Sequence, residues 1–449
     1  NYRSHGYPQF WGHPCTSTTD HMGTSNIGST ATYINGDSIS SGLDRIQSNT
    51  EFQKYLTGRI GYLCHSASID KKLNHGVEII HHICGDKLTA LFAPQHGIYT
   101  DAQDNMIESP HFIHPKYQIP VFSLYSETRV PTPQMLENID TLVIDLQDSG
   151  VRVYTYIWTM VLAMKACAEA GKRVVILDRP NPLDGITIEG NGSEPGFESF
   201  IGLHPLPMRH GMTIGEIALF AQKYWDIDLD LKLVPVHGWM RSTNPFENNQ
   251  LPWVLPSPNL ATLSTLRVYP GTVLFEGTNF SEGRGTARPF ELFGHPDLKA
   301  NQWLEQLNQT LINAGCRHIK LRPHLFVPTF EKWSGTTVHG YQVHFLNTPN
   351  TSLDQRNNPH KTEWLELRGI WYATQIIMRE LNTLMGEAFR WRQPPFEYIY
   401  DLLPIDILNG TDKIRKWIES NGTNDELDRI TANQIAEFLN KRKSVIIYE

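Results

Sequence analysis

Residues 173–178, Arg-Val-Val-Ile-Leu-Asp, have the length of one β-strand and an unbroken apolar centre. A strand with one face in water alternates apolar and polar side chains, whereas a strand buried on both faces of a parallel sheet is apolar almost throughout. The stretch therefore predicts an interior strand of a parallel sheet, and the polar residues that follow it mark the end of that strand.

Four earlier stretches have the same character, and they alternate with helical patterns. The strand-like stretches are 59–64, 88–93, 120–125 and 141–147, and the helical ones are 42–56, 76–84, 132–138 and 156–170. A further helix is expected from residue 213 and a further strand at 229–236. This alternation predicts an α/β fold built on an open, Rossmann-like, doubly wound parallel sheet.

Residue types at the ends of these helices support the same assignment. Thr132 precedes Pro133, which places a capping residue before proline at the first helical position. Gly171 is suited to close the helix before it, and Thr213 with Glu216 has the spacing of a capping box. These signals are independent of the apolar pattern, so the two together strengthen the prediction.

Polar and charged side chains follow four of the predicted strands. The four loops contain Gln95, His96, Asp101 and Asp104; Glu127 and Arg129; Asp148, Arg152, Tyr154 and Tyr156; and Asp178, Arg179 and Asn181. In open α/β sheets, ligands bind outside the carboxyl ends of the strands. We therefore expect these loops to form a binding edge, although single residues have structural alternatives: Asp178 could cap a turn and Arg179 could pair with it.

The pattern changes past residue 258. After a rigid turn at Pro256-Ser-Pro-Asn259, helical patterns at 301–314, 363–385, 411–419 and 431–442 surround strand-like runs at 317–322 and 338–346. We predict a Rossmann-like domain over residues 37–262 and a smaller α+β domain over residues 263–449. Residues 1–36 are rich in Gly, Ser, Thr, Asn and His without periodicity, and we expect a flexible leader or extension there.

The segment 276–290, Glu-Gly-Thr-Asn-Phe-Ser-Glu-Gly-Arg-Gly-Thr-Ala-Arg-Pro-Phe, has no apolar period and is predicted to lie outside the core. Glu276 and Glu282 could act as an acid and base pair, and Arg284 and Arg288 could hold an anionic group. A solvated, glycine-rich turn with incidental charges is the alternative. Because the segment falls near the junction of the two predicted domains, where clefts form, we favour a functional role.

The bulk composition is typical of a globular protein and limits its partners. The chain has 449 residues, enough for two domains, with 40% hydrophobic and 19% charged residues. A formal net charge of −8 argues against nucleic acid or an anionic membrane surface as a partner, since both select basic faces. No stretch approaches 18 uninterrupted apolar residues, so no membrane-spanning helix is expected. Nothing in the sequence indicates an oligomeric state.

Several motifs for cofactors and nucleophiles are missing from the sequence. The residues after the first predicted strand match neither the dinucleotide fingerprint nor the phosphate-binding loop, and no G-x-S-x-G elbow is present. The five cysteines are dispersed without C-x-x-C spacing, which is typical of buried thiols. We expect no cofactor and no metal, although His96, Asp101, Asp104 and His210 could converge on an ion without diagnostic spacing.

The chemistry that remains is acid–base catalysis by carboxyl groups, with arginines available to hold an anion. Two carboxyl groups that flank a bond are the parts of a glycosidase, and their separation sets the stereochemical outcome. A substrate with a 2-acetamido group could also supply its own nucleophile. The residues alone leave retaining, inverting and substrate-assisted routes open.

Ordered stretches along the chain match one known protein family. They are 92–97 (Phe-Ala-Pro-Gln-His-Gly), 120–125 with 127–129, 145–152 (Asp-Leu-Gln-Asp-Ser-Gly-Val-Arg), 155–156, 177–182 (Leu-Asp-Arg-Pro-Asn-Pro), 209–213, 256–259, 269–271 and 276–285. With these stretches, the chain from about residue 50 to its C-terminus resembles the exo-β-N-acetylmuramidases, formerly a family of unknown function and now a glycoside hydrolase family.

The resemblance implies an activity and a place for it. The expected reaction is release of terminal N-acetylmuramic acid from the non-reducing end of peptidoglycan fragments, in a cleft between a Rossmann-like domain and a smaller C-terminal one. The expected setting is bacterial cell-wall turnover or recycling, in the periplasm or outside the cell. Because muramic acid carries a lactyl carboxylate, Arg152, Arg179, Arg209 and Arg284 are candidates to bind it in bidentate fashion.

We predict Glu276 and Glu282 as the catalytic pair, with Asp148 as a third candidate. The predicted substrate-binding residues are Gln95, His96, Glu127, Arg152, Tyr156, Arg179, Asn181, Arg209, His210, Asn259, Asn279 and Arg284.

One residue departs from the family pattern. Many members carry Glu where this chain has Gln95, and an amide cannot donate or take a proton as a carboxylic acid can. Two alternatives therefore stand beside the muramidase: a weakly active or non-catalytic relative that binds peptidoglycan sugars, and an exo-hexosaminidase that prefers another sugar.

Overall fold

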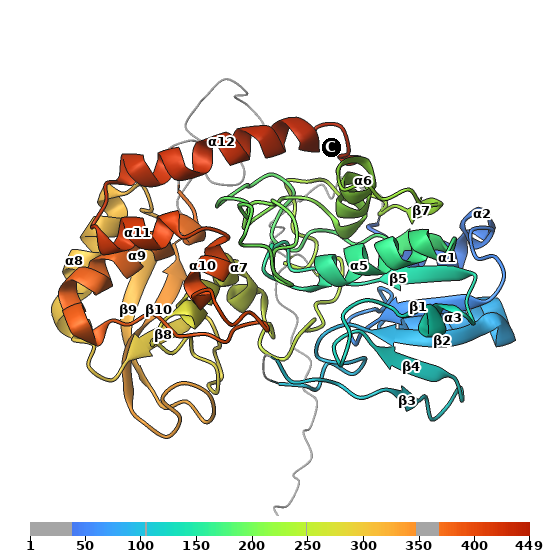
Figure 1. Cartoon of the computed structure of the whole chain (residues 1–449), viewed down its shortest axis with the longest axis horizontal. Helices are drawn as coiled ribbons and strands as arrows, with labels where there is room; N and C mark the ends of the chain where they lie inside the picture. Colours follow the sequence, from blue (N-terminus) through green and yellow to red (C-terminus); the bar gives the residue numbers. More distant parts are fainter. Residues whose placement is uncertain (1–37, 104–105, 248, 347–367) are drawn as a thin grey trace, which may run out of the picture. The chain divides into compact units, whose positions relative to one another are not determined.

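The apolar stretches assemble into one seven-stranded sheet (Figure 1). In this computed structural model, which describes residues 38–103, 106–247, 249–346 and 368–449, the strands are β1 (Ile60–Cys64), β2 (Leu88–Ala93), β3 (Phe112–Ile113), β4 (Pro120–Ser123), β5 (Thr141–Asp145), β6 (Arg173–Leu177) and β7 (Leu231–Val234). Their order is β3-β4-β2-β1-β5-β6-β7, and only β3 pairs antiparallel. Without the short β3, this is the order of a doubly wound sheet, as predicted.

Successive side chains of the central strands enter two different hydrophobic clusters. Leu142 and Ile144 of β5 pack in the cluster that contains the residues of helices α5 and α6, whereas Val143 packs with residues of α1 and α3. The helices are α1 (Gly42–Ser48), α3 (Gly76–Cys84), α5 (Tyr156–Glu169) and α6 (Ile214–Tyr224). Because both faces of the sheet are covered, a strand here needs apolar side chains in both directions.

The capping signals in the sequence correspond to helix ends in the structure. Thr132 caps α4 (Pro133–Leu136), and Thr213 with Glu216 forms the predicted capping box of α6. Gly171 has φ +63° directly after α5, a conformation that glycine adopts at little cost.

The helix predicted at 42–56 is interrupted. Asn49 is extended, and its side chain accepts a hydrogen bond from the backbone of Glu51, so a separate helix α2 (Thr50–Gln53) begins there. The prediction of one continuous helix was therefore wrong, because an Asn side chain can cap a new helix in the middle of an apolar pattern.

The second half contains a three-stranded antiparallel sheet with the order β8-β10-β9. Its strands are β8 (Leu292–His295), β9 (Ile319–Phe326) and β10 (Val338–Phe345), and the helices of this half are α7 (Leu263–Thr272), α8 (Ala300–Asn313), α9 (Ile370–Met385), α10 (Pro404–Asn409), α11 (Lys413–Glu419) and α12 (Asn424–Arg442). The sequence analysis missed β8, α7 and α10. Helix α7 carries Pro270 in its interior, which disfavours a helix in any local pattern.

Some predictions fall outside the described residues or remain untested. The leader predicted at 1–36 and the first residues of the helix predicted at 363–385 lie outside the described residues. Residues 37–449 group as one compact unit by their contacts, so the domain division at residue 262 stays a prediction. In the described part of the chain, no helix combines the length and apolarity needed to cross a membrane.

The two halves share one continuous hydrophobic cluster. Trp158 of α5 belongs to the same cluster as Phe275 and Ile405 from the second half. Helix α12 also returns to the first half, where the Phe438 ring lies 5.8 Å from the ring of Phe220 in α6. This shared packing holds the loops at the carboxyl end of the large sheet against segments of the second half.

Candidate active site

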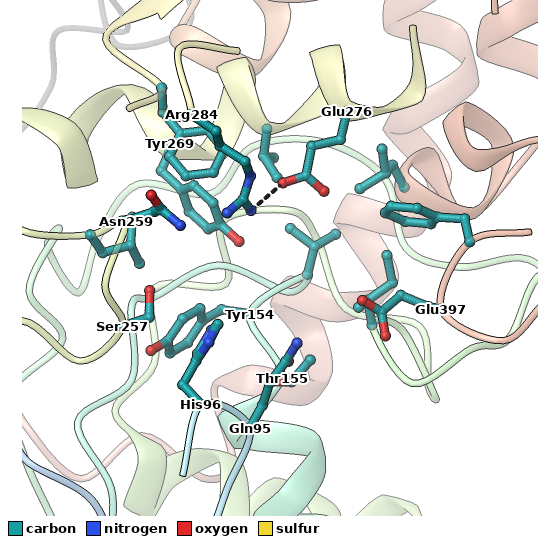
Figure 2. Close-up of a pocket in the computed structure, with 17 residues that line it drawn as sticks. Gln95, His96, Tyr154, Thr155, Ser257, Asn259, Tyr269, Glu276, Arg284 and Glu397 are labelled. Carbon is teal, nitrogen blue, oxygen red and sulfur yellow. Dashed lines mark hydrogen bonds and ion pairs between the residues drawn. The ribbon is translucent and has the colours of Figure 1, made fainter. Parts of the chain in front are cut away.

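A pocket lies where the loops after β2 and β5 meet segments of the second half (Figure 2). The empty space within it is about 500 Å³, which includes space open to solvent. Its polar lining residues are Gln95 and His96 after β2; Tyr154 and Thr155 after β5; Ser257 and Asn259; Tyr269, Glu276 and Arg284; and Glu397. The pocket therefore lies at the carboxyl end of the sheet, as the sequence analysis expected.

The loop after β2 supplies one wall of the pocket. The Gln95 side-chain oxygen accepts a hydrogen bond of 2.7 Å from the Thr155 hydroxyl. The Tyr156 hydroxyl donates to the Pro256 carbonyl at 2.6 Å and lies 3.3 Å from the Gln95 backbone carbonyl, so it supports the wall from behind. The wall is thus tied to the start of α5.

His96 has φ +72°, in the left-handed region that few residues other than glycine occupy. Its Nδ1 lies 2.7 Å from the Ala102 carbonyl, which can only accept, so Nδ1 carries the proton and donates. A strained backbone of this kind persists where surrounding contacts hold it, and such positions cluster at ligand-binding sites.

The opposite wall comes from the 3-10 helix η2 (Val273–Gly277) and the segment after it. Arg284 Nη2 donates to Glu276 Oε1 at 2.7 Å, and Arg284 Nε lies 3.3 Å from Glu282 Oε1. On the far side of Glu282, Lys332 Nζ lies 2.7 Å from Oε2. Two carboxylates and two cations therefore alternate in one cluster.

This cluster overturns the prediction that the segment 276–290 lies outside the core. Glu276, Glu282 and Arg284 are only 4%, 2% and 6% exposed, and Phe280 is fully buried. Burial opposes ionisation of Glu282, but Lys332 and Arg284 together hold its pKa below the usual value. Charges that neutralise one another can be buried without an apolar period, which is why a pattern of hydrophobicity did not reveal this segment.

Glu397 forms a third side of the pocket, and the sequence analysis missed it. It is 5% exposed, it has φ +47°, and its Oε2 accepts a hydrogen bond of 3.2 Å from the Tyr125 hydroxyl. Burial and the negative charge of Glu276 raise the pKa of Glu397 to about 7. Glu397 follows Pro394-Pro395-Phe396, where neither a strand end nor a run of charges marks it in the sequence.

Five of the predicted site residues line the pocket, and Tyr156 lies directly behind its wall. The five are Gln95, His96, Asn259, Glu276 and Arg284. In Figure 2 the Gln95 and His96 side chains lie below the pocket, Glu276 and Arg284 above it and Glu397 to the right. Their catalytic and binding roles stay predictions.

Two of the three predicted catalytic carboxylates do not line the pocket. Glu282 lies behind Arg284, where it contacts Lys332. Asp148 Oδ2 lies 3.2 Å from His210 Nε2 and accepts a hydrogen bond from the Gly150 backbone. Both carboxylates are thus engaged in holding their neighbours.

Three of the four arginines proposed for the lactyl carboxylate are also engaged elsewhere. Arg152 donates to the carbonyls of Asn191, Leu206 and Leu408. Arg179 pairs with the carboxylate of Asp145, and Arg209 pairs with the carboxylates of Asp184 and Glu189. Burial without a carboxylate partner lowers the pKa of Arg152 to about 10. Of these four arginines, Arg284 is the one that lines the pocket.

The remaining predicted residues lie apart from the pocket lining. The Glu127 side chain is 72% exposed and pairs with His111. Asn181 donates to the Met212 carbonyl and Asn279 to that of Ala388.

Within the described ranges, no group of three or more His, Cys, Asp or Glu side chains could hold a metal ion. The convergence of His96, Asp101 and His210 considered above is therefore wrong, and Asp104 lies outside the described residues. Cys64, Cys167 and Cys316 are buried free thiols, as expected, and Cys84 is partly buried.

The pocket, at the carboxyl end of a parallel sheet, contains two carboxyl groups and an arginine, which are residue types that a glycoside hydrolase uses. Comparison with known proteins supplies the family. The family models of the N-terminal and C-terminal parts of the exo-β-N-acetylmuramidase NamZ match residues 60–264 and 267–448. The chain belongs to this family, and the resemblance found in the sequence is confirmed.

Individual relatives agree with this assignment. Over 307 residues the chain is 45% identical to the peptidoglycan β-N-acetylmuramidase NamZ of Bacillus subtilis, which covers 68% of this chain and 72% of that protein. Two crystal structures of DUF1343 family proteins from Bacteroides fragilis each cover 92% of this chain and 99% of their own. Their TM-scores are 0.77 and 0.66, at 26% and 25% identity.

Proposed function

We propose that this protein is an exo-acting glycoside hydrolase that releases terminal N-acetylmuramic acid from the non-reducing end of peptidoglycan fragments. The observation that carries the proposal is the buried Glu276–Arg284 pair in the pocket, with the second carboxyl group of Glu397 beside it. Two carboxyl groups around one pocket are what glycosidic bond cleavage requires. Family membership then points to the sugar.

The recessed position of the lining residues supports an exo mode of action. Gln95, Glu276 and Glu397 come from three different segments, and all three are at most 5% exposed. A pocket with buried walls accepts the end of a glycan chain more readily than the middle of one. We place the terminal sugar here, with amide and hydroxyl groups such as those of Asn259 and Ser257 facing its polar substituents.

Arg284 is the residue we assign to the lactyl carboxylate of muramic acid. Its guanidinium lines the pocket beside Glu276, and arginine can bind a carboxylate in bidentate fashion. The lactyl group is also what distinguishes muramic acid from N-acetylglucosamine. Selectivity between these two sugars therefore tests the assignment.

We also propose that the protein works in bacterial cell-wall turnover, in the periplasm or outside the cell. The support is chemical: peptidoglycan, the proposed source of the substrate, lies outside the cytoplasm. Fractionation of the producing cells, followed by immunodetection, checks this. Recovery of the protein only in the cytoplasmic fraction would contradict it.

The activity is tested with a chromogenic β-N-acetylmuramide and the matching β-N-acetylglucosaminide. We expect cleavage of the muramide, little cleavage of the glucosaminide, and a loss of about 10²-fold or more in Glu276→Gln. Glu387→Gln, which changes an exposed carboxylate outside the pocket, is the matched control and should match the wild type.

The other outcomes favour the alternatives. Preference for the glucosaminide would identify a hexosaminidase with a different sugar preference. Binding of muramic acid without cleavage of either substrate would identify a sugar-binding relative, for which Gln95 would be the explanation.

A further inference from the structure

The pocket needs a group that can give a proton to the departing sugar, and most of its polar residues cannot. Gln95 ends in an amide, which neither donates nor takes a proton as an acid does. Glu276 already accepts a hydrogen bond of 2.7 Å from the guanidinium of Arg284, with which it forms an ion pair. Glu282 does not line the pocket and contacts Lys332 instead. Glu397 is the remaining carboxyl group among the lining residues.

We propose that Glu397 is the general acid and base that cleaves the glycosidic bond. This inference rests on the hydrolase function proposed above and assigns its central proton transfer to a residue that the sequence analysis did not select. Glu397 faces the pocket from a side different from those of Glu276 and Gln95 (Figure 2). A sugar bound in the pocket would thus have the carboxyl group of Glu276 on one side and that of Glu397 on another.

Tyr125, just after β4, positions the Glu397 side chain. Its hydroxyl donates to Glu397 Oε2 at 3.2 Å, and its ring is covered by the Arg129 guanidinium at 4.0 Å. The same guanidinium lies 4.5 Å from the ring of Tyr398, the next residue after Glu397. Arg129 is thus sandwiched between the residue that holds Glu397 and the residue that follows it, which restricts the loop.

The charges around Glu397 suit a proton donor near neutral pH. Burial and the carboxylate of Glu276 raise its pKa, while the Tyr125 hydrogen bond, Arg129 and Arg284 lower it, with a result of about 7. Tyr398, on the same loop, directs its hydroxyl to Glu108 instead. The pocket thus contains a carboxyl group of raised pKa, Glu397, beside the ion pair of Glu276 and Arg284.

The proposed step conserves protons and electrons. The Glu397 proton moves to the glycosidic oxygen while the bond between that oxygen and the anomeric carbon breaks, and the bonding electron pair leaves with the oxygen. Water then adds its oxygen to the anomeric carbon and returns one proton to the Glu397 carboxylate. The Glu276 carboxylate faces the positive charge that develops on the sugar between these events.

The test compares two substrates that differ in how strongly their cleavage depends on protonation of the leaving group. In the disaccharide of N-acetylmuramic acid β-linked to N-acetylglucosamine, the leaving group is an alkoxide unless it is protonated. In para-nitrophenyl β-N-acetylmuramide, it is a stable phenolate. Wild type, Glu397→Gln and the exposed control Glu387→Gln are assayed for kcat/KM on both, across pH.

We expect Glu397→Gln to lose about 10²- to 10⁴-fold on the disaccharide and less than about tenfold on the nitrophenyl glycoside. The fall of wild-type activity as pH rises through about 7 should also disappear on the nitrophenyl substrate in this variant. Equal losses on both substrates, or no loss on either, would overturn the role of Glu397 while wild-type activity upholds the hydrolase function. No cleavage of either substrate by the wild type would overturn both.

A second variant keeps the proposal testable if Glu397→Gln does not fold. Tyr125→Phe retains the ring and removes the hydroxyl that lowers the pKa of Glu397. The alkaline midpoint of kcat/KM should therefore move to higher pH. A midpoint that stays in place or moves down would overturn the assignment, because a purely structural tyrosine would not shift it upward.

Discussion

The two carboxyl groups of the pocket, Glu276 and Glu397, are equally buried but differ in their partners. Glu276 is bonded to Arg284, so its negative charge is matched inside the protein. Glu397 is bonded to the neutral hydroxyl of Tyr125, and its pKa rises to about 7. Burial and the negative charge of Glu276 raise the pKa of Glu397, and the hydrogen bond from Tyr125 offsets them only in part.

Removal of the positive charge of Arg284, which pairs with Glu276, should give the largest change in stability. In Arg284→Met, the buried carboxyl groups of Glu276 and Glu282 both lose their ion pair with Arg284, so we expect a loss of about 3–5 kcal/mol in the free energy of unfolding, measured by urea denaturation. The control is Arg267→Met, whose side chain is 49% exposed and pairs with Glu247; we expect a loss below about 1 kcal/mol. Similar losses in the two variants would show that the buried cluster is not special.

The pH dependence of stability should reveal the raised pKa of Glu397. A carboxyl group whose pKa is raised from 4.5 to about 7 on folding stabilises the protein fully below pH 4.5, and this contribution is lost as pH rises through about 7. Relative to Glu397→Gln, the wild type should therefore lose about 3 kcal/mol of unfolding free energy between pH 4 and pH 8.

The prediction concerns the difference in unfolding free energy between the wild type and Glu397→Gln. Burial also raises the pKa of Asp178 to about 7, but Asp178 contributes equally to both proteins and cancels in the difference. Denaturant unfolding at each pH gives the difference. A constant difference between wild type and variant across this range would contradict a raised pKa at Glu397.

The smallest effect is expected at position 95. In Gln95→Glu, a carboxylate oxygen can accept the same hydrogen bond from Thr155 that the amide accepts now. Because Glu397 supplies the proton in our proposal, kcat/KM on the disaccharide should change by less than about tenfold, or about 1.4 kcal/mol. Gln393→Glu, at an exposed position, is the control. A rise of a hundredfold or more in Gln95→Glu alone would place the acid at residue 95 instead.

The sheet and one wall of the site could be predicted from the sequence because both depend on local patterns. Each interior strand is apolar on both faces, and polar residues after a strand lie at its carboxyl end by topology. Gln95 and His96 were found in this way, and both line the pocket. The same rule also selected Glu127 and Arg179, which bind His111 and Asp145 instead, because an edge of a sheet holds more polar residues than one pocket can use.

The second wall was predicted only in part. The charged segment 276–290 drew attention to Glu276 and Arg284, which line the pocket, but its burial was not expected, and Glu282 contacts Lys332 and does not line the pocket. Five residues lie between Glu276 and Glu282, and no periodicity in the segment indicates which of the two faces the pocket. Glu397 was missed because an irregular loop brings it to the pocket from a distant part of the chain.

The sequence by itself determined the class of the fold, the alternation of strands and helices that builds the large sheet, and the family of the protein. These follow from apolar periodicity, capping residues and ordered motifs, all of which are local properties of the chain. Only the tertiary structure decided which carboxyl groups share a pocket and which cation or hydroxyl each one contacts. The physical reason is that the protonation of a buried carboxyl group depends on neighbours within a few ångströms, and Tyr125, which contacts Glu397, comes from a segment that meets it only when the two halves pack together.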